Sequence, residues 1–175
     1  MARHNSGAAM SHADMPKASM AGPPLSPIPR QWAPRAAAGA IIVFDGRDYL
    51  LQLRDMRSDI WYPGHWGLFG GQNLPGETPE DSIRRELVEE LGFKPRKLCV
   101  FAEMAFGFSF ATGQLSRVVF EVHLDRRGFR RLKLQEGRLM RVFRACEINN
   151  ALSVVPCDGF VLDLHIHRSR EGDRE

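Results

Sequence analysis

The sequence predicts a single α/β domain, in which helices cover both faces of a β-sheet. Two observations lead to this fold class. Short apolar segments rich in strand-forming residues alternate with turn residues, and several other stretches carry helical periodicity. A length of 175 residues with 43% hydrophobic content suits one globular core plus a tail.

The expected elements follow the chain in order. An Asp45-Gly46 turn separates the first two apolar segments and predicts a hairpin. Strands are expected at 38–44, 49–53, 98–105, 117–124 and 139–143, the segment 66–69 leads into a glycine-rich stretch, and helices are expected at 145–152 and 158–167. The segments 55–65 and 106–116 contain glycines or proline and are expected as loops.

The segment 79–91 is expected to form a helix with both ends marked. Thr78 is a suitable N-cap, and Pro79 suits the first helical position. Gly92 is a suitable C-terminal stop. Residues at helical spacing are expected to face a core: Ile83, Leu87, Val88 and Leu91.

Three glutamates share one face of this helix. Glu86, Glu89 and Glu90 stand at positions i, i+3 and i+4, so their side chains lie close together and repel one another. A divalent cation would relieve the repulsion, and carboxylate oxygens suit Mg²⁺ or Mn²⁺. The alternative is a solvated acidic helix face, which is the usual meaning of three such residues alone.

A longer pattern surrounds these glutamates. Its fixed positions are Gly71, Glu77, Arg85, Glu86, Leu87, Glu89, Glu90, Gly92 and Phe93, after the segment Trp66-Gly67-Leu68-Phe69-Gly70. This pattern resembles the signature of the Nudix hydrolases, the family that includes the MutT-like nucleotide phosphatases. The resemblance extends more loosely over 35–166 and implies the Nudix α/β/α sandwich with a mixed sheet.

The resemblance also implies site residues. Metal ligands would be Gly70, through its carbonyl oxygen, and Glu86, Glu89 and Glu90. Catalytic roles would fall to Glu89, Glu136, Glu77 and Arg85. Glu136 would serve as a loop base or further ligand, with a simple turn residue as the alternative. Arg85 would pair with Glu77 to brace the loop, and it should point away from the metal face because it precedes Glu86 by one residue.

The function that the resemblance implies is Mg²⁺- or Mn²⁺-dependent hydrolysis of a nucleoside diphosphate linked to another group. Two subgroup features, a proline typical of ADP-ribose enzymes and a tyrosine typical of diadenosine polyphosphate enzymes, are absent. A nucleoside triphosphate or nucleotide-sugar is then the expected substrate. The alternatives are a non-catalytic Nudix-fold nucleotide sensor, and an RNA-directed Nudix hydrolase that uses the basic residues in 126–144.

Other side chains leave two interpretations open. The basic stretch 126–144 could hold phosphates, but it is more often a solvated loop. Trp61, Tyr62, His65 and Trp66 could stack a base or pack a loop onto the sheet. Phe106, Phe108 and Phe110 alternate and are expected to face the core, with a ligand-facing stripe as the alternative. His165 and His167 are expected at the surface.

The expected organisation is a disordered tail at 1–35, a Nudix domain at 36–168 and a charged C-terminal tail at 169–175. A transit peptide within 1–35 is the alternative for that segment. Three widely spaced cysteines and the lack of a long apolar run fit a reduced, cytoplasmic protein without a membrane span. A net charge of +3 does not demand nucleic acid as a partner, and a homodimer is left open.

Deletion of residues 1–34 should leave activity and melting temperature almost unchanged, because this stretch lacks a core-forming pattern. Thermal unfolding and turnover of the shortened chain test this. A drop of many degrees, or loss of soluble protein, would show that the segment packs on the domain.

Overall fold

The computed structural model describes residues 36–107, 114–151 and 153–172. The predicted tail at 1–35, and Phe108 and Phe110 of the predicted aromatic stripe, lie outside these residues. Six strands and four helices are present in the described part: β1 (Ala37–Phe44), β2 (Asp48–Leu53), β3 (Trp66–Gly67), α1 (Pro79–Leu91), β4 (Cys99–Gly107), β5 (Gln114–Leu124), α2 (Arg126–Phe129), β6 (Leu139–Phe143), α3 (Ala145–Ala151) and α4 (Pro156–Gly172).

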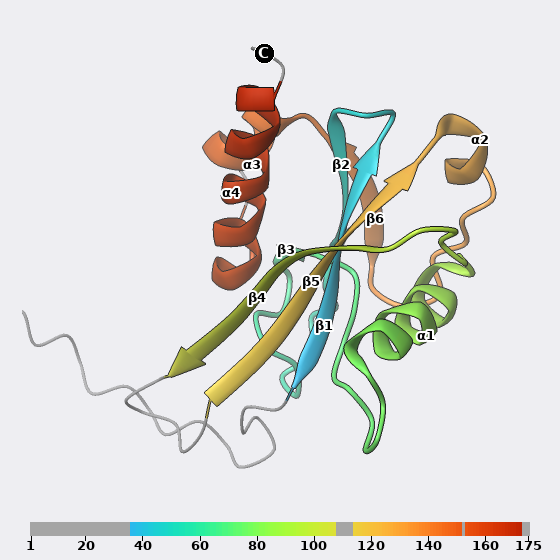
Figure 1. The fold of residues 1–175 in the computed structure, drawn as a ribbon, viewed down its shortest axis with the longest axis vertical. Coiled ribbons are helices and arrows are strands. Elements are labelled where there is room, and N and C mark those ends of the chain that lie inside the picture. Colours follow the sequence, from blue (N-terminus) through green and yellow to red (C-terminus); the bar gives the residue numbers. More distant parts are fainter. Residues whose placement is uncertain (1–35, 108–113, 152, 173–175) are drawn as a thin grey trace, which may run out of the picture.

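The strands form one mixed sheet in the order β3-β2-β1-β5-β4, with β6 also pairing with β2. Strands β1 and β5 run parallel, whereas the other pairs are antiparallel. Figure 1 shows the sheet as a central layer, with α1 on one side and α3 and α4 on the other. The fold is therefore the α/β/α sandwich that the sequence predicted.

Each face of the sheet has its own hydrophobic core. On the α1 side, Ile83, Leu87 and Leu91 pack against β1 and β5 residues such as Ile42 and Val122. On the α4 side, the buried residues include Ile41, Leu51, Phe143, Val161, Leu162 and Ile166. The alternation along β1, with Ile42 on one face and Ile41 on the other, follows from the two-residue period of a strand.

Most predicted elements are present, with some differences at their ends. Strands β4 and β5 extend into the predicted loop 106–116, and α4 continues to Gly172, into the segment predicted as a charged tail from 169. The short helix α2, capped by Asp125, was not predicted. Val88 is only half-buried, and His165 is buried with 3% exposure, so the surface position predicted for His165 is wrong.

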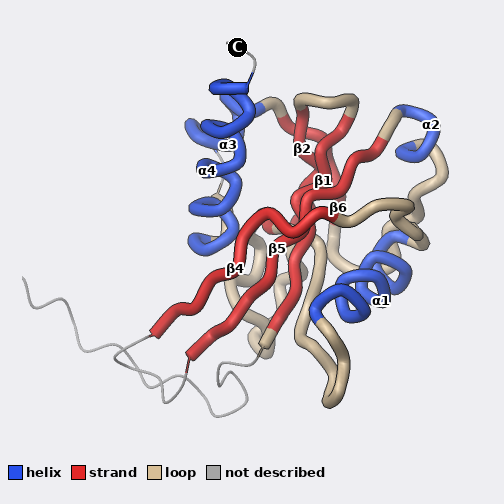
Figure 2. The backbone as a smooth tube through the Cα atoms, viewed as in Figure 1, coloured by secondary structure: helices blue, strands red, loops and turns tan. Residues whose placement is uncertain are grey.

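A structured segment from 66 to 72 crosses between β2 and β1. Its first residues pair with β2, where Gly67 lies opposite Gln52, and its last residues pair with β1 through Ala40–Phe69 and Ala37–Gln72 bridges. From the other side, Asp158 of α4 accepts a hydrogen bond from the Leu68 N–H at 2.8 Å. Only Trp66–Gly67 of this segment belongs to a named strand, and Figure 2 distinguishes the strands of the sheet from the loops that connect them. The pairing of this segment with β2 and with β1 fixes the position of Gly70.

Cys99, Cys146 and Cys157 are free thiols. Trp66 packs against Phe143 with ring centroids 4.7 Å apart, which favours packing rather than base stacking for this aromatic. Within the described ranges, no helix combines the length and apolar character needed to cross a bilayer.

Gly70 and Gly76 offer a matched pair of substitutions. Both have positive φ, 125° and 83°, but a Cβ on Gly70 would lie 2.4 Å from the Ala38 carbonyl oxygen, whereas a Cβ on Gly76 meets nothing within 4 Å. Gly76→Ala should therefore cost only the strain of a left-handed conformation, about 1–2 kcal/mol. Gly70→Ala should cost clearly more in chemical unfolding, and equal losses would contradict the close backbone approach.

Candidate active site

The glutamates of α1 are oriented by well-defined helix ends. Thr78 accepts a hydrogen bond from the Asp81 N–H at 3.1 Å, and Pro79 occupies the first turn. Gly92 ends the helix in the left-handed conformation with φ of 63°. These caps hold α1 in one register, so Glu86 and Glu90 face the segment that carries Gly70 and Gly71.

Glu90 is the buried member of the cluster, with 5% exposure. Its Oε1 accepts a hydrogen bond from Gln52 Nε2 at 2.9 Å, and its Oε2 accepts one from the Gly70 N–H at 2.8 Å. Burial raises the pKa of Glu90 to about 7, although both hydrogen bonds favour the charged form. Glu90 thus joins α1 to β2 and to the crossing segment.

Glu86 lies one turn before Glu90 and faces Gly71. A Cβ on Gly71 would lie 2.5 Å from Glu86 Oε1, so a side chain at position 71 would displace this carboxylate. Burial raises the pKa of Glu86 as well. Glu89 is more open, with half of its side chain exposed.

Arg85 contacts every other charged residue of the predicted site except Glu90 and Glu136. Its Nε and Nη2 bind the two carboxylate oxygens of Glu77 at 2.8 and 3.1 Å. Its Nη1 lies 2.8 Å from Glu86 Oε1 and 2.9 Å from Glu89 Oε2. The hydrogen bonds from Arg85, and that from the Leu74 N–H, lower the pKa of Glu77 to about 2.

The pairing of Arg85 with Glu77 is present, but the predicted orientation of Arg85 is wrong. The side chain does not point away from the glutamate face, because a guanidinium presents donors in several directions and bridges Glu77 to Glu86 and Glu89. Arg85 also donates to the Gln72 carbonyl oxygen at 3.1 Å. It therefore fastens the loop before α1 to the helix.

The predicted metal ligands are close together but do not converge on one point. In the described part of the chain, no group of three His, Cys, Asp or Glu side chains is arranged to hold a metal ion. The carboxylates are instead engaged by Arg85, Gln52 and Gly70. Gly70 meets the cluster through its N–H, and the role predicted for its carbonyl oxygen stays a prediction.

Glu136 comes from a loop that is anchored beside the end of α1. The Gln135 N–H donates to the Glu90 carbonyl oxygen at 2.8 Å, and the Arg138 N–H donates to the Leu53 carbonyl oxygen at 2.9 Å. Glu136 itself is exposed, and its charge contributes to the raised pKa values of Glu86 and Glu90. The loop thus adds a fifth carboxylate to the surroundings of the cluster.

Gln52 is a site residue that the sequence analysis missed. It is 4% exposed, and its Nε2 donates to the Leu68 carbonyl oxygen at 3.2 Å as well as to Glu90. The available signal was a polar residue inside the otherwise apolar strand segment Tyr-Leu-Leu-Gln-Leu. A buried amide needs partners, so such a residue indicates a polar contact behind the strand.

The comparisons with known proteins agree with this architecture. The family model described as NUDIX domain matches residues 33–150. The MutT protein of Methanosarcina mazei Go1 is similar in fold, with a TM-score of 0.64 and 18% identity over 82% of this chain and 99% of that chain. The NUDIX domain of Shewanella oneidensis NrtR, solved with ADP ribose, gives a TM-score of 0.61 with 19% identity over 79% and 88%.

A curated relative shares more sequence over a shorter segment. The nucleoside triphosphatase NudI of Escherichia fergusonii is 46% identical over 54 residues, which are 31% of this chain and 37% of that relative. The chain thus matches well under half the length of this relative. Because the family model covers most of the chain, the protein belongs to the NUDIX domain family.

The bridge made by Arg85 predicts coupled effects. Arg85→Ala should lower the melting temperature by a few degrees and reduce turnover, because it frees Glu77 and removes the cation between Glu86 and Glu89. The double variant Arg85→Ala with Glu77→Ala should cost less than the two single variants summed. Arg85→Lys is the charge-matched control, and additive losses would mean that the two residues act independently.

Proposed function

We propose that this protein is a Mg²⁺- or Mn²⁺-dependent hydrolase of nucleoside diphosphates linked to another group, with nucleoside triphosphates the first candidates and nucleotide-sugars the second. One observation carries the proposal. The carboxylates of Glu86 and Glu89 share one Arg85 nitrogen, while Glu86 and Glu90 lie against the backbone of Gly71 and Gly70. The name of the NudI relative supports the triphosphate class.

The donor set fits a hard divalent cation. All of its side-chain donors are carboxylate oxygens, which Mg²⁺ and Mn²⁺ prefer. Burial raises the pKa values of Glu86 and Glu90, and a nearby cation would favour their charged forms again. Arg85 Nη1 already supplies a positive charge to Glu86 and Glu89. Glu86, Glu89 and Glu90 are therefore the residues that would hold the metal.

When bound, such a cation neutralises charge on phosphate oxygens and lowers the barrier to attack at phosphorus. The chain contributes the other requirements. Gly70 and Gly71 have no side chains, which leaves room for the Ala38 carbonyl oxygen beside Gly70 and for the Glu86 carboxylate beside Gly71. Glu89 and Glu136 are the exposed carboxylates and are our candidates to accept a proton from the attacking water. Glu77 and Arg85 are positioning residues that hold the loop on α1.

Water adds to one phosphorus of the anhydride, and the bond from that phosphorus to the bridging oxygen breaks. A nucleoside triphosphate then yields a nucleoside monophosphate and inorganic diphosphate. A nucleotide-sugar yields the monophosphate and a sugar phosphate. Neither reaction releases inorganic phosphate directly.

This product pattern defines the substrate screen. Nucleoside triphosphates and nucleotide-sugars are incubated with Mg²⁺ or Mn²⁺, and phosphate is measured with and without added inorganic pyrophosphatase. Phosphate that appears only with pyrophosphatase supports cleavage to monophosphate and diphosphate. Nucleotide binding without turnover of any compound would contradict the proposal and favour the non-catalytic sensor.

The carboxylates provide the mutational test. Glu89→Gln and Glu90→Gln should each lower turnover by about 100-fold or more, since even residues that only support metal ligands cost about 10- to 100-fold when changed. Both variants should stay folded, because glutamine keeps the shape of the side chain. Glu90→Gln should nevertheless lower the melting temperature, since the amide nitrogen of glutamine cannot accept the hydrogen bond from Gln52 or from Gly70 that one carboxylate oxygen accepted. The circular dichroism spectrum and melting temperature check this.

Glu80→Gln is the matched control. Glu80 lies on the same helix, is exposed, and pairs with Arg84 outside the cluster. This variant removes the same charge from α1, so its turnover should remain close to that of the parent. Near-parental turnover of Glu89→Gln and Glu90→Gln at saturating Mg²⁺ would remove the metal-site proposal.

A further inference from the structure

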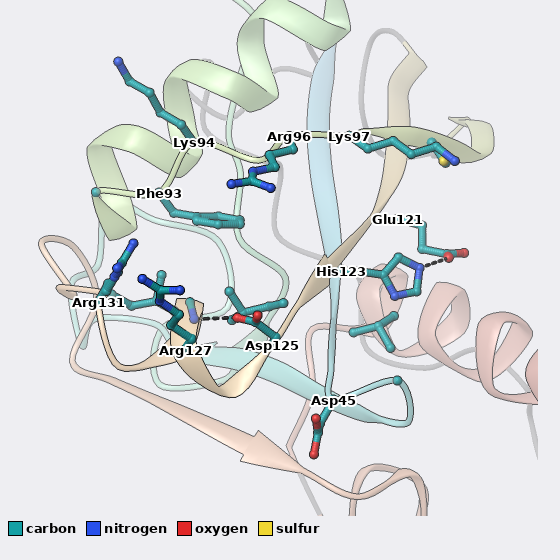
Figure 3. A pocket seen from close by; sticks show the side chains of 17 residues that line it. Asp45, Phe93, Lys94, Arg96, Lys97, Glu121, His123, Asp125, Arg127 and Arg131 are labelled. Carbon is teal, nitrogen blue, oxygen red and sulfur yellow. Dashed lines mark hydrogen bonds and ion pairs between the residues drawn. The ribbon is translucent and has the colours of Figure 1, made fainter.

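A basic groove lies beyond the end of α1, outside the glutamate cluster. Its volume is about 1020 Å³, and none of the residues of the candidate active site lines it. Five cations of the groove come from two segments that are distant in sequence. Lys94, Arg96 and Lys97 follow α1, whereas Arg127 lies in α2 and Arg131 follows that helix. Figure 3 shows Arg96 between Phe93 and Lys97, with Arg127 and Arg131 beside Phe93.

The five cations have no ion-pair partner among residues 36–107, 114–151 and 153–172. This separates them from three arginines of the basic stretch 126–144. Arg126 pairs with Asp45, and Arg141 and Arg144 both pair with Glu147. The basic residues of this stretch therefore do not form a single surface, since Arg127 and Arg131 line the groove together with the cations that follow α1.

Three carboxylates also line the groove, but each is already engaged. Asp125 accepts from the Gly128 N–H at 2.6 Å, and Asp45 accepts from Arg126 at 2.9 Å. Glu121 binds His123 at 2.7 Å, His165 at 3.1 Å and Arg168 at 2.7 Å. Among these lining residues, five cations but only one carboxylate, that of Asp125, lack an ion pair, so the unpaired charge of the groove is positive overall.

The two walls of the groove are fixed relative to each other. The Lys133 N–H donates to the Leu91 carbonyl oxygen at 3.0 Å, which ties the segment after α2 to the end of α1. Arg84 donates to the Pro95 carbonyl oxygen at 3.0 Å and anchors the segment that carries Lys94, Arg96 and Lys97. A preformed cationic groove loses little conformational entropy when an anion binds.

We propose that this groove binds a chain of consecutive phosphates, supplied by single-stranded nucleic acid or by inorganic polyphosphate. Arginine and lysine side chains bind phosphate oxygens well, and the cations are spread over two walls, which suits several phosphates rather than one. An acidic peptide fits less well. Phe93 and Leu132 pack against the core and offer little free apolar surface to anchor its side chains.

The test measures binding of the full chain to a fluorescent single-stranded RNA of about ten nucleotides, a length within the usual site sizes. Anisotropy is recorded over a range of salt concentrations. Each phosphate contact should contribute about −0.7 to the slope of log K against log salt. The triple variant Arg96→Ala, Arg127→Ala, Arg131→Ala should bind at least tenfold more weakly, with a slope flatter by about 2.

The control is the triple variant Arg130→Ala, Lys133→Ala, Arg138→Ala. It removes the same charge from exposed positions of the stretch 126–144 that do not line the groove. Its affinity and salt slope should stay near those of the parent. Equal losses in the two triple variants would overturn the proposal, because binding would then follow net charge alone.

Competition identifies the source of the phosphates. Displacement of the labelled RNA by inorganic polyphosphate and unlabelled RNA with similar affinity supports recognition of a phosphate chain as such. Displacement by RNA alone supports the proposal with nucleic acid as the source, and displacement by polyphosphate at much lower concentrations than unlabelled RNA supports it with polyphosphate as the source. Displacement by polyglutamate as effective as that by RNA would overturn it in favour of an acidic protein partner.

Discussion

The buried carboxylate of Glu90 is the interaction on which the site depends. It receives hydrogen bonds from Gln52 of β2 and from the backbone N–H of Gly70, so it connects the helix, the sheet and the crossing segment. Burying a carboxylate is costly unless its oxygens find donors, and the raised pKa of Glu90 reflects that cost. The fold accepts it because both donors belong to elements that are already fixed by pairing with β1 and β2.

The acidic cluster also depends on the positive charge of Arg85. Glu86 and Glu89 repel each other, and Arg85 relieves this by placing one nitrogen between them while its other nitrogens hold Glu77. The arginine thus connects the acidic cluster to the loop before α1 through strong charge-assisted bonds. A cation that bound to the cluster would share Glu86 and Glu89 with Arg85, so its affinity would depend on the same contacts that stabilise the loop.

The sequence predicted the fold well where local rules decide the structure. The Thr78 cap, the Gly92 stop and the Asp45-Gly46 turn depend on neighbours within a few residues, and all three are present. Contacts between distant residues were not predictable in this way. Gln52 reaches Glu90 across 38 positions, and His165 is buried against Tyr49, 116 positions away, because the sheet and α4 bring them together. No local pattern reports such proximity.

The end of α1 at Gly92 also separates the glutamates of this helix from the basic residues that follow it. A helix continued past Leu91 would place Lys94 four residues after Glu90, at the spacing where a cation neutralises a glutamate. The left-handed conformation of Gly92 ends the helix first, and Lys94, Arg96 and Lys97 instead line a groove with Arg127 and Arg131. One glycine thus keeps Lys94 out of helical spacing with Glu90 and leaves the basic segment after α1 beside α2.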